Sequence, residues 1–277
     1  MSDRTTRLSA RDAAGLAYRE TGSAAGPAMV LLHSLGGDGH MWDACTPALG
    51  RDHRLVIPDT RGHGASGPAA TASVDQWVED LEDVLDAAGA HQVLLVGVSL
   101  GGIQAIAFAA AHPDRVRGLV VADSFVALRP EVAEVKIRGL VDHSRQQPMH
   151  AVADQYIADT FQHPYPDGAA AVRRSIAAMD ADSYAAAVQA CFGVQIQDRL
   201  WQVEAPTLVL WGERDGKTPR HLSEQIADGI DGAVLEVIPA AGHLSNIDNP
   251  DAFAAAVTAF SAACGERPAR LRVEEGK

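Results

Sequence analysis

The sequence predicts an α/β protein with a mostly parallel sheet covered by helices on both faces. Short apolar runs recur along the chain, and segments with helical spacing of apolar residues lie between them. Such strict alternation favours right-handed crossovers between neighbouring parallel strands. Since the strands then point the same way, we expect ligands to bind at their C-terminal ends.

Six apolar runs are predicted to be buried strands. Most end near Gly, Asp or Ser, and they are too short to form buried helices. The runs span residues 28–33, 54–57, 92–97, 115–122, 206–211 and 233–238.

Two of the intervening helices carry clear starting signals. In residues 73–88, the apolar side chains from Val74 to Ala88 form one stripe along the predicted helix, and Ser73 with Gln76 fits a capping box at its start. The last helix is expected to open at Asn249 and Pro250, because proline suits the first helical position.

The alternation stops between residues 126 and 200, a stretch rich in Ala without a convincing β run. We interpret this stretch as a helical cap inserted between two strands of the sheet. The expected organisation is therefore a core in two parts, 1–125 and 201–263, a cap at 126–200, and a mobile tail at 264–277.

Composition excludes several classes of function. The chain has 277 residues, with 23 Lys and Arg against 36 Asp and Glu, so its formal net charge is −13. This balance gives no support for binding nucleic acid or an anionic membrane. Cys45, Cys191 and Cys264 are too far apart for a zinc motif or a disulfide framework. No leader or membrane span is recognisable, so we expect a cytoplasmic protein.

The strongest chemical signal is Gly97-Val98-Ser99-Leu100-Gly101. It directly follows an apolar run and precedes the helical stretch 102–111, which is the strand-turn-helix context that a nucleophilic serine needs. The flanking glycines allow a cramped turn that exposes the Ser99 hydroxyl. We therefore expect Ser99 to be a nucleophile.

A serine nucleophile needs a base and a group that orients the base. His243 follows the last predicted strand in Ala241-Gly242-His243-Leu244, and we expect it to be the base. Asp215 follows the strand 206–211 and is the preferred acid, in the order Ser, Asp, His. Asp123 ends the strand after the nucleophile and stays open as an alternative acid.

An oxyanion hole would complete this site. One backbone N–H is expected from Leu100, the residue after the nucleophile. The second is expected from Leu35, in the Gly-rich turn after the first buried strand. The Gly-rich loop at 59–66 lacks a following Lys-Ser/Thr, so it does not indicate a phosphate site.

Together these motifs resemble the α/β-hydrolase family, and most closely its 3-oxoadipate enol-lactone hydrolases. The resemblance spans about residues 8 to 262. It is carried by His33-Ser34-Leu35-Gly36-Gly37-Asp38, Asp59-Thr60-Arg61-Gly62-His63-Gly64-Ala65-Ser66, Ser99-Leu100-Gly101-Gly102 and Ala241-Gly242-His243-Leu244-Ser245-Asn246.

The resemblance implies hydrolysis of a small carboxylate-bearing lactone through an acyl-enzyme, with no cofactor and no metal. Ser99, Asp215 and His243 match the family's triad. Two positions depart from the pattern: His33 replaces a small or amide residue, and an aromatic residue is missing near Ala133.

A carboxylate substrate would favour a cation in the pocket. The cap offers Lys136, Arg138, Arg173 and Arg174, each of which could instead lie on a solvated helix face. The hypothesis is that Lys136 or Arg138 binds the acid.

Other functions stay open at this level. The same triad could cleave a carbon–carbon bond or act as a cofactor-free perhydrolase. A non-catalytic binding module is disfavoured because all three triad residues are present. A dehydrogenase is disfavoured because no G-x-G-x-x-G follows the first strand.

Overall fold

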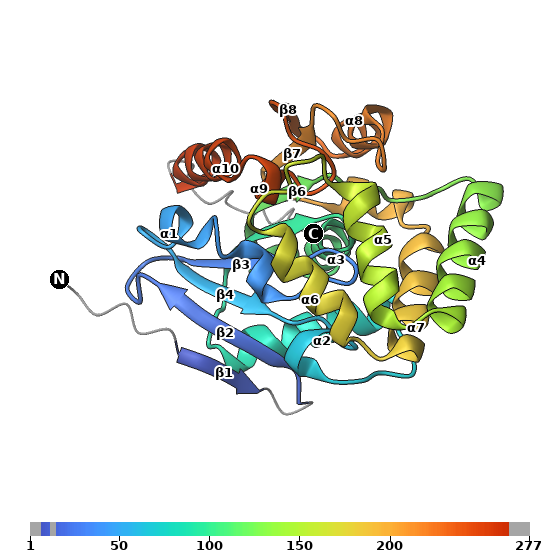
Figure 1. The fold of residues 1–277 in the computed structure, drawn as a ribbon. Coiled ribbons are helices and arrows are strands. Elements are labelled where there is room, and N and C mark those ends of the chain that lie inside the picture. Colours follow the sequence, from blue (N-terminus) through green and yellow to red (C-terminus); the bar gives the residue numbers. More distant parts are fainter. Residues whose placement is uncertain (1–6, 12–14, 266–277) are drawn as a thin grey trace, which may run out of the picture.

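The computed structural model describes residues 7–11 and 15–265. Within them one eight-stranded sheet has the order β1-β2-β4-β3-β5-β6-β7-β8. The first two strands run antiparallel to their neighbours, and the others are parallel (Figure 1). The strands are β1 (Arg7–Arg11), β2 (Ala17–Gly22), β3 (Ala28–Leu32), β4 (Arg54–Pro58), β5 (Val93–Val98), β6 (Val116–Ala122), β7 (Thr207–Gly212) and β8 (Val234–Ile238).

Helices cover both faces of this sheet, as the sequence predicted. The helix α3 packs on β3, β5 and β6, whereas α10 packs on β6 and on α1. The α-helices are α1 (Thr46–Leu49), α2 (Val74–Ala87), α3 (Leu100–Ala111), α4 (Pro130–Gln146), α5 (Met149–Thr160), α6 (Ala169–Ala178), α7 (Ala181–Phe192), α8 (Arg220–Gly229), α9 (Ser245–Asp248) and α10 (Pro250–Gly265). Short 3-10 helices are η1 (Gly39–Trp42), η2 (Gly64–Ser66), η3 (Pro113–Arg115) and η4 (Gln197–Gln202).

The helix ends follow the local chemistry of the sequence. Ser73 Oγ accepts the Gln76 N–H at 3.2 Å, which is one half of the predicted capping box. Pro250 is the first residue of α10, and Asn249 Oδ1 accepts the Ala252 N–H at 3.2 Å. This helix continues to Gly265, and residues 266–277 of the predicted tail lie outside the described residues.

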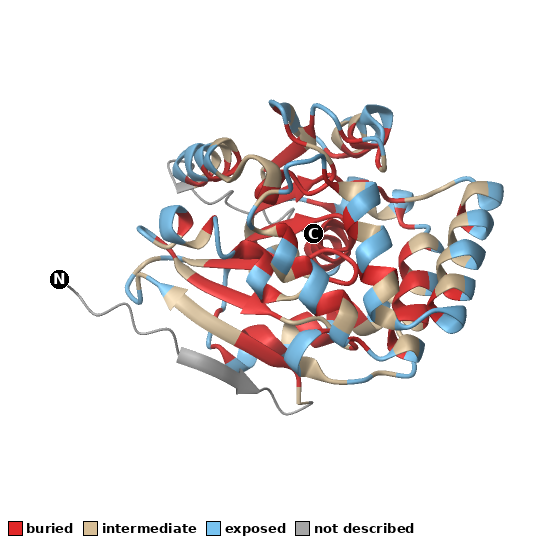
Figure 2. Cartoon of the chain, in the orientation of Figure 1, coloured by how far each residue is buried: buried red, intermediate tan, exposed pale blue. Residues whose placement is uncertain are grey.

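The core is centred on β3 and β5, the strands that lead to the predicted nucleophile and oxyanion loop. All six residues of β5 are buried, and every residue of α3 except Ala111 is buried as well. Figure 2 shows this buried centre, with exposed residues on the outer sides of the surrounding helices. The site therefore rests on the most rigidly packed part of the fold.

Between β6 and β7, a stretch that the structure describes throughout, four α-helices follow one another. The helix α5 packs against α6, and α4 packs against α7. Figure 1 shows α5 and α6 in front of the core and α4 at its outer edge. An isolated antiparallel bridge between Ala127 and Gln195 holds the two ends of this insertion together.

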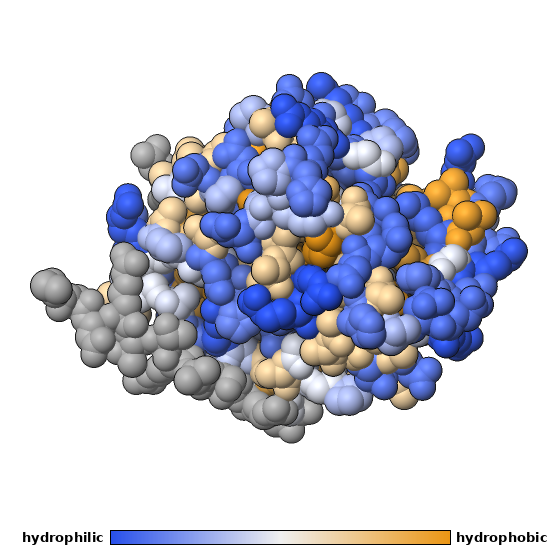
Figure 3. Space-filling model, viewed as in Figure 1, coloured by the Kyte–Doolittle hydropathy of each residue, from blue (hydrophilic) through white to orange (hydrophobic). Residues whose placement is uncertain are grey.

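The face of the molecule that carries α4, α5 and α6 is mainly hydrophilic (Figure 3). Figure 3 shows polar residues over most of the visible face, with an apolar area over α4. Val135 on that helix is 70% exposed. Among the described residues, no helix combines the length and the apolar character that crossing a bilayer requires.

A buried histidine pair joins the loops after β3 and β4. The rings of His33 and His63 have centroids 5.1 Å apart, and both side chains are buried. Burial, and next the neighbouring His33, lower the pKa of His63 to about 3. His63 is therefore neutral in the folded protein at neutral pH.

The first prediction concerns stability in acid. The pKa of His63 is lower in the folded chain than the ordinary value of about 6.5. Below about pH 6.5, His63 is therefore protonated in the unfolded chain but stays neutral in the folded chain. Stability from this group is present above about pH 6.5 and is lost as the pH falls towards 3. Replacing His63 with Gln should remove about 2 kcal/mol of the pH dependence of the unfolding free energy between pH 7 and 5.

Urea unfolding at the two pH values measures this difference. His91→Gln is the matched control, because His91 is exposed. An equal pH dependence in wild type and the His63 variant would contradict the assignment.

Candidate active site

Ser99 stands in a sharp turn between β5 and α3. Its backbone has φ 56° and ψ −114°, a conformation that non-glycine residues rarely adopt. A Cβ on Gly97 would lie 2.1 Å from the Gly101 carbonyl oxygen, and a Cβ on Gly101 would lie 2.2 Å from the Leu32 carbonyl oxygen. Glycine is therefore required at both positions for this turn to form.

The structure brings together Ser99, His243 and Asp215, the three residues singled out in the sequence. His243 Nε2 lies 3.1 Å from Ser99 Oγ, and His243 Nδ1 lies 3.0 Å from Asp215 Oδ2. All three side chains are buried, and Ser99 and His243 are only 6% and 7% exposed. The contacts place a proton acceptor at the serine and an acidic partner behind the imidazole.

Asp215 is held as a carboxylate by several donors. Its Oδ1 accepts the N–H groups of Lys217 and Thr218 at 2.8 and 3.0 Å. Its Oδ2 accepts the Thr218 hydroxyl and His243 Nδ1–H. Burial raises the pKa of Asp215, but the charge of His243 and the hydrogen bonds outweigh burial and hold the pKa below its usual value. The carboxylate is thus ionised beside the imidazole.

Asp123, the alternative acid, has a different position. Its Oδ1 accepts the Gly212 N–H at 2.7 Å, and its Oδ2 accepts the N–H and hydroxyl of Ser245 at 3.1 and 2.5 Å. None of these contacts reaches the His243 ring, whereas Asp215 Oδ2 contacts the imidazole directly. Burial, and next the charge of Asp215, raise the pKa of Asp123.

Asp123 instead ties together the loops that carry the acid and the base. Gly212, the last residue of β7, precedes Asp215 by three residues, and Ser245 follows His243 by two residues. The next residue, Ser124, donates its hydroxyl to the Ser99 carbonyl at 2.7 Å. Two consecutive residues after β6 therefore hold all three triad loops.

The two predicted oxyanion donors lie in suitable segments. Leu100 is the first residue of α3, where the N–H groups have no acceptor within the helix. Leu35 is 7% exposed and lies in the turn after β3, where the Gly37 N–H donates to the Ser34 carbonyl at 2.9 Å. The helix N-terminus also favours negative charge at this point.

The unexpected His33 has a structural role in this turn. Its Nε2 accepts the Thr60 N–H at 2.9 Å, so Nδ1 carries the proton and donates to the Ser34 carbonyl at 2.8 Å. The imidazole thereby connects the loop after β4 to the turn that bears Leu35. From the sequence alone, His33 is visible only as a departure from the family's pattern, because its partner Thr60 lies in another loop.

Comparison with known proteins identifies the family of this chain. Residues 29–256 match the alpha/beta hydrolase family. The chain is 30% identical to 3-oxoadipate enol-lactonase 1 of Acinetobacter baylyi over 233 residues, covering 82% of this chain and 85% of the relative. It is 27% identical to a putative carbamate hydrolase RutD of Azorhizobium caulinodans over 251 residues, covering 87% and 92%.

A solved structure is similar over nearly the whole fold. The enol-lactonase of Burkholderia xenovorans LB400 has a TM-score of 0.83 at 28% identity, covering 92% of this chain and 99% of that one. The predicted resemblance to enol-lactonases is thus confirmed at the level of sequence and fold. This chain belongs to the alpha/beta hydrolase family.

Proposed function

We propose that this hydrolase cleaves a small carboxylic ester or lactone through an acyl-enzyme on Ser99. The contact that carries the proposal is the 3.1 Å approach of His243 Nε2 to Ser99 Oγ, with Asp215 behind the imidazole. The similarity to two enol-lactonases favours 3-oxoadipate enol-lactone, or a similar carboxylate-bearing lactone, as the substrate.

The first half-reaction follows from the positions of the three side chains. His243 Nε2 takes the proton from Ser99 Oγ while this oxygen forms a bond to the substrate carbonyl carbon. The negative charge on the carbonyl oxygen is received by the N–H groups of Leu35 and Leu100. The bond from the carbonyl carbon to the leaving oxygen then breaks, and His243 gives its proton to that oxygen.

Water completes the reaction. His243 removes a proton from water, whose oxygen bonds to the acyl carbon, and the bond to Ser99 Oγ breaks as the serine regains a proton. In a lactone the leaving oxygen belongs to the same molecule, so a single open-chain acid results. Asp215 stabilises the imidazolium in both steps.

The second prediction tests the substrate. Purified enzyme should hydrolyse 3-oxoadipate enol-lactone faster than 4-nitrophenyl acetate, because the lactone is the substrate that the relatives indicate. Ser99→Ala should reduce both rates to background, since no nucleophile remains. Initial rates measured with both compounds and with this variant decide the result.

The outcomes separate the substrate from the chemistry. Similar slow rates on both compounds would exclude the lactone as the preferred substrate but would not contradict hydrolysis by Ser99, His243 and Asp215. Equal rates in wild type and Ser99→Ala would contradict the proposed mechanism. The same preparations should also be assayed for carbamate hydrolysis, carbon–carbon bond hydrolysis and perhydrolysis, which are the alternative reactions. Carbamate hydrolysis is included because one relative is a putative carbamate hydrolase.

The third prediction distinguishes the two buried aspartates. Asp215→Asn should lower kcat by roughly 10³ to 10⁴-fold, because the imidazole loses its ionised partner. Asp123→Ala should lower kcat by only about 100-fold with KM nearly unchanged, since it loosens the loops without removing a reacting group. Asp123→Asn keeps an acceptor for Gly212 and should recover part of that loss.

Steady-state kinetics across pH give the readout. The pH profile of Asp123→Asn should keep its wild-type shape, because His243 and Asp215 are intact. A larger loss at Asp123 than at Asp215 would contradict the assigned roles.

A further inference from the structure

Lys217 brings a positive charge close to the triad from the loop of the acid. Its backbone N–H donates to Asp215 Oδ1, and its ammonium lies 4.5 Å from the centre of the Tyr156 ring on α5. No ion pair of this ammonium is found among the described residues. Burial is the largest influence and lowers the pKa of Lys217; next, the charge of Asp159 raises it, that of Lys136 lowers it and that of Asp215 raises it.

The Tyr156 side chain connects this ammonium to the oxyanion turn. Burial raises the pKa of Tyr156 to about 12, and the phenol approaches the Ser34 side chain. Ser34 is fully buried, and it directly precedes Leu35. Tyr156 thus contacts the Lys217 ammonium through its ring and lies close to the side chain that precedes Leu35.

Lys136 reaches the same region from α4. Its ammonium lies 5.5 Å from the centre of the Phe192 ring, and Phe192 stacks on Phe125 with ring centres 5.9 Å apart. Phe125 directly follows Ser124, which holds the Ser99 carbonyl. No ion pair of Lys136 is found within the part of the chain that the structure describes.

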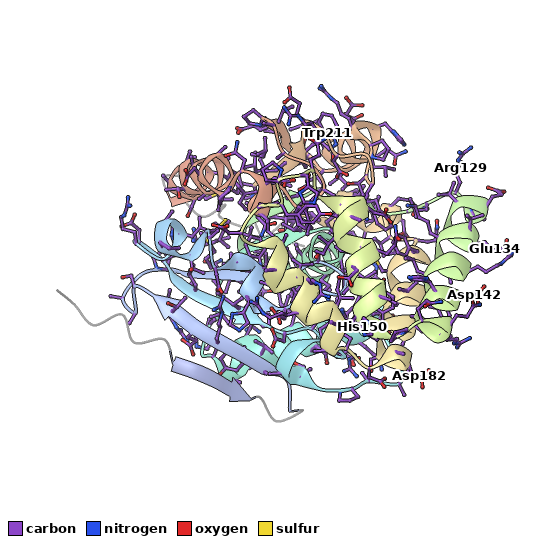
Figure 4. The ribbon with its side chains drawn as sticks, viewed as in Figure 1. Arg129, Glu134, Asp142, His150, Asp182 and Trp211 are labelled. Atoms are coloured by element: carbon purple, nitrogen blue, oxygen red, sulfur yellow. The ribbon has the colours of Figure 1, made fainter. Side chains whose placement is uncertain are left out.

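The other cations named by the sequence are engaged elsewhere. Arg138 pairs with Glu134, and both side chains are about two-thirds exposed. Figure 4 shows Glu134 pointing away from the body of the molecule, so this pair lies on the outer side of α4. Arg173 pairs with Asp154 at 2.6 Å.

Arg174 lines a separate cavity of about 380 Å³ between α6 and the loops after β3 and β4. No triad residue lines that cavity. Of the two cap cations that the sequence suggested for binding the substrate acid, Lys136 and Arg138, only Lys136 remains a candidate. The structure adds Lys217, which lies in the loop after β7, as a second candidate.

Both ammonium groups are half-buried, and neither forms an ion pair among the described residues, so their burial and the repulsion between them raise the free energy of the protein without a bound anion. An anion between them would offset both the burial and the mutual repulsion. The carboxylate of Asp215 cannot serve this purpose, since its oxygens already accept four hydrogen bonds.

We propose that Lys136 and Lys217 together bind a carboxylate group of the substrate, next to the carbonyl that Ser99 attacks. This inference rests on the proposed hydrolase function and adds the residues that select an acidic substrate. Aromatic rings under both ammonium groups keep their positions fixed in the absence of the anion.

The fourth prediction uses adipate, a dicarboxylate, and adipamide, its uncharged counterpart of equal length. Isothermal titration calorimetry on the full-length protein measures both affinities without needing turnover. Wild type should bind adipate at least about tenfold more tightly than adipamide. Lys217→Met and Lys136→Met should each weaken adipate binding about tenfold and leave adipamide binding within about twofold.

Matched controls locate the site. Arg138→Met removes an ion-paired cation from the same helix as Lys136 and should leave the adipate affinity unchanged. Lys217→Arg keeps the charge and should recover most of the affinity. Adipate should also slow the labelling of Ser99 by a fluorophosphonate, because the bound anion occupies the space beside the nucleophile.

Two outcomes would overturn the proposal. One is equal affinity for adipate and adipamide. The other is an adipate affinity that does not change in either lysine variant. A protein that binds adipate as predicted but hydrolyses neither 4-nitrophenyl acetate nor the lactone would instead refute the proposed function alone.

Discussion

The carboxylate of Asp123 is the contact on which the arrangement of the site depends. It accepts hydrogen bonds from Gly212, the last residue of β7, and from Ser245, the first residue of α9, and these two residues flank the loops that carry Asp215 and His243. Its neighbour Ser124 holds the turn of Ser99. Because β5, β6, β7 and β8 are neighbours in the sheet, the two residues that follow β6 can reach the segments of all three side chains.

The backbone conformations at Asp123 and Ser99 cost free energy, which the rest of the fold must offset. Asp123 is fully buried with φ 49°, and Ser99 has φ 56°. Strained backbone at such positions persists only where the surrounding structure determines it. The fully buried strand β5 and the almost wholly buried α3 provide that rigid surrounding. The inserted helix α5, in contrast, contributes the Tyr156 ring, which lies against the Lys217 ammonium.

Much of the fold was predictable because the central strands are continuous apolar runs. All six predicted strands are present, and each boundary lies within one residue of its prediction. The strands β1 and β2 were missed, because β2 mixes Ala17 and Tyr18 with the polar residues Arg19 and Glu20. An antiparallel strand near the edge of a sheet does not need a continuous apolar run.

The triad geometry was also predictable, since motif order and strand ends place Ser99, Asp215 and His243 at one edge. The supporting contacts were not. The links from His33 to Thr60 and from Asp123 to Ser245 join loops that are distant in sequence. Lys217 was missed because nothing in the local sequence shows that its ammonium lies over Tyr156 on an inserted helix. Such contacts depend on tertiary structure alone.

Rapid-quench intact-mass analysis with 4-nitrophenyl acetate tests most directly whether Ser99 forms an acyl-enzyme. We expect a burst of 4-nitrophenol with one acetyl group per chain, located on Ser99 by peptide mapping and absent from Ser99→Ala. An enzyme that turns over while no acetyl group is found on Ser99, or that acetylates equally in the variant, would contradict it.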